Sequence, residues 1–164
     1  MAFSDDLLEQ SDHLARREKN RPRQASLRRA VSTAYYALFH LLTSEAVVNW
    51  KQVEHRHLLA RTFEHGNMRR VADEQVKSLH NYFRSNPPSG ASRATAEKLY
   101  RVAKVFLQLQ AQRHLADYDN SIIWTRTDVL EQTDAAKQAF QSWKAIRDSS
   151  PAQDFLFSLM LKRR

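Results

Sequence analysis

The sequence predicts an all-α fold, an up-and-down bundle of about five to six main helices, on three observations. Only two glycines and four prolines occur in 164 residues, whereas β-sheet proteins need such residues at frequent turns. Several long stretches repeat apolar residues at the three- and four-residue spacing of a helix. The hydrophobic content of 42% suffices for one core in a chain of this length. We therefore expect residues 1–164 to form a single domain.

The first helix is expected from about Ser4 to Lys19. Ser4 is a typical N-cap residue, and the acidic pair Asp5 and Asp6 would lie in the first turn, where the helix dipole favours negative charge. The segment Asn20-Arg21-Pro22 then ends the helix, because proline cannot continue it.

The second helix, from about Arg23 to Asn49, is apolar over most of its circumference. One side carries Val31, Ala34, Leu38, Leu41 and Leu42, and the other carries a polar seam of Arg29, Ser32, Tyr36, His40 and Thr43. Such a helix belongs inside a bundle. Its polar seam must therefore find partners, because an unpaired buried polar group costs about 1–3 kcal/mol.

The middle third is the most basic part of the sequence. From Lys51 to Arg101 it holds ten basic and five acidic residues. We expect two helices here, about His55–His65 and Asn67–Phe83, separated at Gly66-Asn67. The composition of residues 85–92 predicts an exposed loop.

Another long helix is expected from about Arg93 to Asp119. Its apolar stripe continues by helical steps to Arg113 and Asp117, so the stripe ends in a charged pair. This pair is either an ordinary intrahelical ion pair or a contact with Arg29, Tyr36 and His40 across the bundle.

Two further helices complete the predicted bundle. Thr125 and Asp128 have the spacing of a capping box for a helix that ends near Asp148. Ser150-Pro151 would then begin the last helix as N-cap and first helical residue, with Gln153 at the capping-box position.

Several classes of protein are excluded by what the sequence lacks. It has no cysteine, no glycine-rich phosphate loop, no nucleophile elbow and no zinc-protease motif. His55 and His57 point in different directions on a helix, so we expect no metal and no cofactor. The acidic N-terminus is unlike a signal peptide, and no apolar run reaches the roughly 18 residues of a membrane span. We expect a cytoplasmic protein.

The charge balance is strongly basic, with 26 Lys and Arg against 18 Asp and Glu, a net charge of +8. Such an excess favours polyanions such as nucleic acid, and it also serves plain solubility.

Two motifs resemble the HEPN family (higher eukaryotes and prokaryotes nucleotide-binding domain). The first is Arg29-Ala30-x-Ser32-x-Ala34-Tyr35-Tyr36-Ala37-x-Phe39-His40, and the second is Arg113-x-x-Ala116-Asp117-Tyr118. They cover about Arg23 to Tyr118 and are closest to small bacterial and archaeal members. The resemblance implies an α-helical up-and-down bundle, usually a dimer. It also implies a role in RNA cleavage, toxin–antitoxin or antiviral systems, often beside a minimal nucleotidyltransferase.

The chain departs from the catalytic members of that family. They carry an arginine, four to six residues and then a histidine on a late helix, and none of the seven histidines here follows an arginine at that spacing. After Arg113, the corresponding positions hold Tyr118, Asp119 and Asn120. Metal-independent RNA cleavage needs an acid and a base, which histidine supplies near neutral pH. Only His40, facing Arg113, or His114 would replace the missing group.

We therefore expect an HEPN-like RNA- or nucleotide-binding protein of a prokaryotic defence or toxin–antitoxin type system. The expected binding residues are Arg29, Tyr36, His40, Arg113 and Tyr118. One alternative is a degenerate ribonuclease with His40, Arg113 and Asp117 as catalytic candidates. The other is a non-catalytic interaction module whose polar seam joins two copies. The expected partners are a second copy of the chain, RNA or a nucleotide, and a nucleotidyltransferase.

Overall fold

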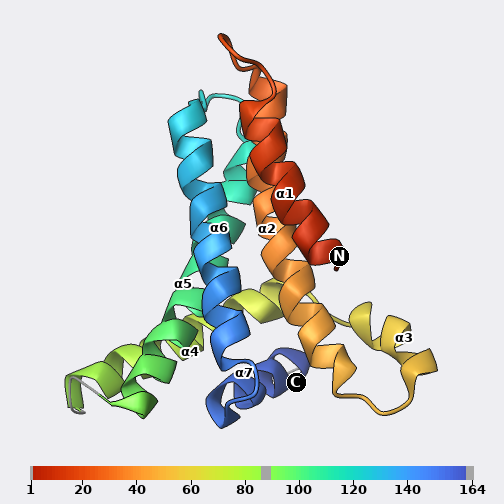
Figure 1. The fold of residues 1–164 in the computed structure, drawn as a ribbon, viewed down its shortest axis with the longest axis vertical. Coiled ribbons are helices and arrows are strands. Elements are labelled where there is room, and N and C mark those ends of the chain that lie inside the picture. The colour runs from red at the N-terminus through yellow and green to blue at the C-terminus, as the bar shows by residue number, and fades with distance from the viewer. Residues whose placement is uncertain (1, 86–89, 162–164) are drawn as a thin grey trace. The chain divides into compact units, whose positions relative to one another are not determined.

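The regular structure of the chain is helical throughout the computed structural model, which describes residues 2–85 and 90–161 (Figure 1). The helices are α1 (Phe3–Arg16), α2 (Gln24–Val48), α3 (Arg56–Ala60), α4 (His65–Ser85), α5 (Ala91–Tyr118), α6 (Arg126–Ile146) and α7 (Ser150–Met160), with a 3-10 turn η1 (Val53–His55) before α3. The described ranges hold no strand. The prediction of an all-α helical bundle is confirmed, and α2 and α5 are the long helices that the apolar periodicity indicates.

Two of the predicted N-caps are wrong by one or two residues. The first helix begins at Phe3 with Ala2 as N-cap, so Ser4 lies inside the helix, where its side chain is buried. Asp5 and Asp6 do lie in the first turn. Ser149, not Ser150, is the N-cap of α7, and the Gln153 side chain donates to the carbonyl oxygen of Arg147 instead of closing a capping box. Neither Ala2 nor Ser149 makes a side-chain capping hydrogen bond, so the preference of serine for the N-cap position does not decide where these two helices begin.

The predicted break at Gly66-Asn67 is also wrong. Helix α3 ends at Ala60, and α4 begins at His65, so Gly66 lies in the first turn of α4. The Thr62 hydroxyl donates to the carbonyl oxygen of Leu59 and ends the earlier helix. Four residues of the expected loop 85–92, namely 86–89, lie outside the described residues.

The predicted capping box before α6 is confirmed. The Asp128 carboxylate accepts the backbone N–H of Thr125 at 3.1 Å, and the Thr125 hydroxyl accepts the N–H of Asp128 at 3.1 Å. This reciprocal pair satisfies two N–H groups that the first turn of a helix leaves without an intrahelical partner.

The chain divides into two compact units. Unit 1 comprises residues 1–41 and 108–140, and unit 2 comprises residues 42–107 and 141–164. Helices α2, α5 and α6 each contribute residues to both units. The expectation of a single domain stays a prediction.

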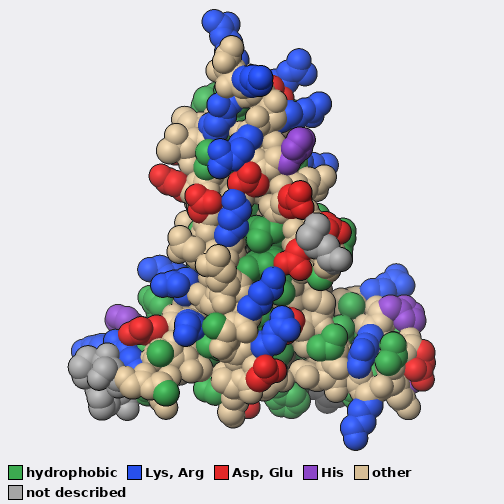
Figure 2. All heavy atoms as spheres, viewed as in Figure 1, with side chains coloured by type: hydrophobic (Ala, Val, Ile, Leu, Met, Phe, Trp, Pro, Cys, Tyr) green, Lys and Arg blue, Asp and Glu red, His purple; other side chains and the backbone are tan. Residues whose placement is uncertain are grey.

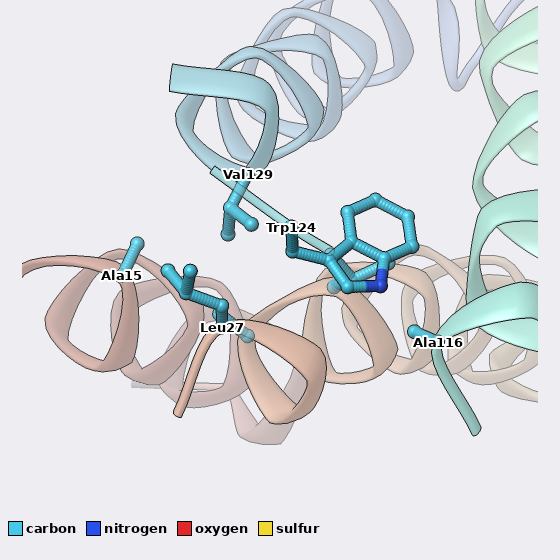
Figure 3. Packing of buried hydrophobic residues seen from close by; sticks show 7 residues of the cluster. Ala15, Leu27, Ala116, Trp124 and Val129 are labelled. Carbon is cyan, nitrogen blue, oxygen red and sulfur yellow. The ribbon is translucent and has the colours of Figure 1, made fainter. Parts of the chain in front are cut away.

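The core of unit 1 forms where four helices meet around one tryptophan. Ala15 of α1, Leu27 of α2, Ala116 of α5 and Val129 of α6 converge on Trp124 from the connection between α5 and α6 (Figure 3). Gln24 holds that connection: its side-chain amide donates to the Trp124 carbonyl at 2.8 Å and accepts the Trp124 N–H at 2.9 Å. The first residue of α2 therefore fixes the position of the central side chain.

Unit 2 has its own core. Its largest fully buried side chains include Met68, Phe106, Trp143, Phe155 and Leu156, which come from α4, α5, α6 and α7. Helix α4 packs against α7. Asn67 links the same two helices, because its side-chain amide donates to the carbonyl oxygens of Leu159 and Leu161, both at 3.2 Å.

Side chains from other elements donate to carbonyl groups at or just beyond the carboxyl ends of six helices in the described part of the chain. The last carbonyls of a helix lack intrahelical donors, and a glycine with positive φ commonly supplies the cap. Here the described residues include a single positive-φ residue, Gly90, which precedes α5. The side chains that donate to carbonyls at or just beyond the helix ends are Arg126 for α1, Arg56 for α2, Arg93 for α4, Arg28 for α5, Gln153 for α6 and Asn67 for α7.

Arg28 makes the largest of these caps. Its guanidinium donates to the carbonyl oxygens of Ala116 and Asp119 at 2.9 Å each, and to that of Ile122 at 2.7 Å. Arg28→Ala should therefore lower the free energy of unfolding by about 2–4 kcal/mol, because three carbonyls lose a charged donor. Urea denaturation measures this.

The neighbouring substitution Arg29→Ala is the matched control. Arg29 is exposed, so its removal should change the free energy of unfolding by no more than about 0.5 kcal/mol. Equal effects of the two substitutions would contradict the capping role of Arg28.

Candidate functional site

The polar seam of α2 does find partners, as the sequence analysis requires. Within unit 1, Ser32 is buried, Tyr36 and His40 are half-buried, and Arg29 is exposed. The opposite side of the helix is buried at every predicted apolar position, namely Val31, Ala34, Leu38, Leu41 and Leu42. The seam therefore divides into a part that faces α5 and a part that faces α1.

The part that faces α5 is a polar network of four residues. The Tyr36 hydroxyl accepts a hydrogen bond from Arg113 Nη2 at 2.8 Å, and Arg113 Nε lies 2.8 Å from Asp117 Oδ2 in an ion pair. The Ser32 hydroxyl donates to Asp117 Oδ1. This network contains the Arg113–Asp117 pair and joins it to α2, so the contact across helices exists in addition to the intrahelical one.

Arg113 is charged, and most of its guanidinium already binds groups of the protein. Burial lowers the pKa of Arg113, but the Tyr36 hydroxyl, the Asp117 carboxylate and Tyr118 oppose burial, and the net result is a raised pKa. The guanidinium carbon lies 5.4 Å from the centre of the Tyr36 ring and 5.8 Å from that of Tyr118. Only 20% of the Arg113 side chain is exposed, and Asp117 compensates its charge. The main role of Arg113 is therefore to orient Tyr36, and its charge is less available to an anionic ligand.

The part of the seam that faces α1 lines an open groove of about 430 Å³. Its walls are Phe3, Leu7, Gln10 and Leu14 of α1, together with Arg29, Thr33, Tyr36 and His40 of α2. Three of the predicted binding residues, Arg29, Tyr36 and His40, therefore share one cavity. None of the eight lining residues is acidic. An anion would meet cationic and hydroxyl groups there without a carboxylate to repel it.

His40 lies among aromatic rings at this groove. Its ring centre is 5.0 Å from that of Phe3 and 5.4 Å from that of Phe39, both edge to face, and 6.5 Å from that of Tyr36. Burial lowers the pKa of His40 below its ordinary value of 6.5, because the apolar surroundings disfavour the charged form. The imidazole is therefore mainly neutral at pH 7. Tyr36 contacts both His40 and Arg113 and connects the two parts of the seam.

Tyr118 and His114 lie on the exposed side of α5. Tyr118 is 66% exposed, and its ring centre lies 5.0 Å from that of His114. Tyr118 does not line the groove that Arg29, Tyr36 and His40 share. Among the described residues, no group of three histidines or carboxylates is placed to hold a metal ion.

The capping role of Arg28 is not evident from the sequence, although Arg28 and Arg29 are neighbours. A helical wheel does not show which of two adjacent arginines meets the end of another helix, because that depends on where α5 ends. The signal available in the sequence was the scarcity of glycine, which leaves the carboxyl ends of helices to be capped by other side chains.

The positive charge is unevenly divided between the two units. By sequence, unit 1 holds ten basic and ten acidic residues, whereas unit 2 holds sixteen basic and eight acidic residues. The whole net charge of +8 therefore belongs to unit 2. The polar seam lies in unit 1, which is electrically neutral overall.

The comparisons with known proteins are negative. No family model matches the chain, and no curated protein or solved structure matches it. Membership of the HEPN family therefore stays a prediction based on the two sequence motifs. Within the two described ranges, no helix combines the length and apolar character needed to cross a membrane.

A double-mutant cycle tests the polar network. Ser32→Ala and Asp117→Ala each remove one side of a hydrogen bond at a buried serine, so their effects on the free energy of unfolding should couple by about 0.5–3 kcal/mol. Urea denaturation of both single variants and the double variant gives the coupling. Ser32→Ala combined with Asp134→Ala, on an exposed carboxylate that pairs with Lys137, should be additive. Additivity of the first pair would contradict the network.

The surroundings of His40 predict a pH dependence of stability. Because the folded protein holds the pKa of His40 below its unfolded value near 6.5, the unfolded chain binds the proton first as the pH falls. The contribution of His40 to stability is complete above about pH 6.5 and declines as the pH falls through the unfolded value towards the folded one. His40→Gln should remove this decline, measured as the free energy of unfolding between about pH 8 and pH 5. His13→Gln, at an exposed position on α1, should keep the profile of the unmodified protein.

Proposed function

We propose that this chain is an HEPN-like RNA-binding protein of a prokaryotic defence or toxin–antitoxin type system, and that the groove between α1 and α2 takes a nucleotide of the RNA. The observation that carries the proposal is the groove itself, where Arg29, Thr33, Tyr36 and His40 lie together without an acidic neighbour. These four belong to, or lie beside, the motif that resembles the family.

The groove has the chemical features that a nucleotide requires. Arg29 makes no ion pair in the described part of the chain, so its charge is available to a phosphate group. Phe3 is exposed at the groove and offers a ring on which a base can stack. Leu7 and Leu14 supply an apolar wall.

Arg113 and Asp117 have a positioning role in this proposal. The hydrogen bond from Arg113 to the Tyr36 hydroxyl fixes the direction of the Tyr36 ring, which lines the groove. Asp117 in turn holds Arg113, and Ser32 holds Asp117. The network would thus keep the groove in shape before RNA arrives, which lowers the entropic cost of binding.

A ribonuclease activity is the second candidate, because His40 is neutral and lies in the same groove as Arg29. A neutral imidazole can accept the proton of a ribose 2′-hydroxyl as that oxygen attacks the adjacent phosphorus, and an arginine stabilises the charge that develops on the phosphate. The bond from phosphorus to the 5′-oxygen then breaks, the 5′-oxygen takes a proton from water or from the imidazolium, and the products are a 2′,3′-cyclic phosphate and a 5′-hydroxyl. Incubating structured RNA with the purified protein, His40→Ala and Arg113→Ala tests this. Equal cleavage by all three proteins would assign the activity to a contaminant.

The resemblance adds two protein partners to the proposal, a second copy of the chain and a minimal nucleotidyltransferase. The polar seam would then either bind RNA or join two copies. Sedimentation of Asp117→Ala separates these roles, since a seam that joins two copies should lose the dimer when the network is broken.

The main test is RNA binding measured by fluorescence anisotropy over a range of salt concentrations. Arg29→Gln should weaken binding of a labelled single-stranded RNA by about ten-fold or more, and should reduce the slope of log affinity against log salt by about 0.7, the value for one phosphate contact on a single strand. Arg16→Gln, which removes an arginine of α1 that pairs with Asp12 and does not line the groove, is the control. Binding that is insensitive to salt, or equal in Arg29→Gln and the unmodified protein, would contradict the proposal.

A further inference from the structure

Residues 48–62 of unit 2 form an ordered segment in which no residue is buried. The segment contains the 3-10 turn η1 and helix α3, and neither element has a buried residue. It nevertheless exposes four large apolar side chains within eleven residues, namely Val48, Trp50, Val53 and Leu58. Scattered single apolar residues on a surface are ordinary, but a concentration of this kind marks an interaction surface.

Trp50 stands out among the three tryptophans of the chain. Its side chain is 49% exposed, whereas Trp124 is 6% exposed and Trp143 is fully buried. The backbone that carries Trp50 is pinned by Arg56, which donates from Nε to the Trp50 carbonyl at 2.9 Å and from Nη2 to the Val48 carbonyl at 2.8 Å. The indole is therefore presented to solvent on a fixed support.

The charges around Trp50 are mainly positive. Lys51, Arg56 and Arg61 lie in the segment with a single acidic residue, Glu54, and His55 and His57 are exposed beside them. Figure 2 shows hydrophobic, Lys and Arg, and His side chains close together over α3. Carbonyl groups carry no formal charge, so the hydrogen bonds of Arg56 leave its positive charge uncompensated.

The electrostatic field of unit 2 favours a negatively charged partner. Unit 2 carries the entire net charge of +8, so the corresponding surface of a second copy would be repelled and a polyanion would be attracted. An exposed aromatic ring between cations is the arrangement that binds single-stranded nucleic acid, since bases stack on the ring and phosphates pair with the cations.

We propose that residues 48–62 form a stacking platform for single-stranded RNA, on which a base stacks against Trp50 while Lys51 and Arg61 contact the flanking phosphates. This inference rests on the proposed RNA-binding function, and it adds a second contact surface, in unit 2, to the groove of unit 1. Bases in a duplex are already stacked on one another, so the platform selects unpaired RNA.

The test uses the intrinsic fluorescence of the full-length protein together with the anisotropy of a labelled oligouridine about twelve nucleotides long. Because the other two tryptophans are buried, quenching of the exposed fraction of the emission reports on Trp50. We expect oligouridine to quench this fraction, and Trp50→Ala to weaken binding by about five- to one-hundred-fold, the range for one base–aromatic stack.

Three variants separate stacking from other effects. Trp50→Phe should restore most of the affinity, and Trp50→Leu should not, because leucine is apolar but has no ring. Lys51→Gln should lower the salt slope by about 0.7, whereas the Trp50 variants should leave the slope unchanged. Phe157→Ala, at an exposed aromatic residue of α7, should bind like the unmodified protein.

The outcomes distinguish this inference from the proposed function. Oligouridine that binds without quenching Trp50, and with equal affinity to Trp50→Ala, would overturn the platform and leave the groove proposal in place. Preference for a duplex of the same length over oligouridine would also overturn it. A Trp50 emission that changes with protein concentration and not with RNA would assign the surface to contact between copies and overturn the inference. Absence of any RNA binding would overturn both proposals.

Discussion

The structure depends on how the carboxyl ends of its helices are satisfied. A helix leaves its last carbonyl groups without donors, and a chain with only two glycines has few chances to end helices in the left-handed conformation. Long polar side chains, most of them arginines, donate to carbonyl groups at or just beyond six helix ends in the described residues. Each of these hydrogen bonds also joins two elements of the same unit. The same interaction therefore satisfies a carbonyl at a helix end and fixes the position of the neighbouring element.

This use of arginine changes what the basic composition means. Part of the excess of Lys and Arg arises from caps such as Arg28, Arg56 and Arg126, which bind neutral carbonyls and keep their charge, whereas Arg93 also pairs with Glu97. Their first role is to hold the fold together, and attraction of a polyanion is a consequence of the charge that they retain. Unit 1 balances its charges, and unit 2 does not. The excess positive charge therefore belongs to unit 2, whereas the groove between α1 and α2 belongs to unit 1.

The sequence predicted the features that depend on local period and composition. The long helices, the buried side of α2 and the Thr125–Asp128 capping box follow from patterns within a few residues. Helix starts at Ser4 and Ser150 were misplaced because serine is common both at N-caps and inside first turns. The link from Arg113 to Tyr36 was one of two alternatives that the sequence offered, since Arg113 extends the apolar stripe of its helix towards the core and Tyr36 lies on the polar seam of α2. The groove that Phe3 lines and the cap that Arg28 makes could not be predicted from the sequence, because they depend on how α1 and the end of α5 lie against α2.

The caps also bear on how the chain folds. Arg28 lies 88 to 94 residues from the carbonyls that it binds, and Arg126 lies 107 to 108 residues from its own acceptors. A helix whose end is completed only by such a distant residue frays while it is alone, because nucleation and end effects dominate short isolated helices. In unit 1 the helices should therefore reach full length together with tertiary contacts, which makes folding more cooperative and slower than for a bundle with purely local caps. Peptides cut from single helices would be poor substitutes for the intact unit.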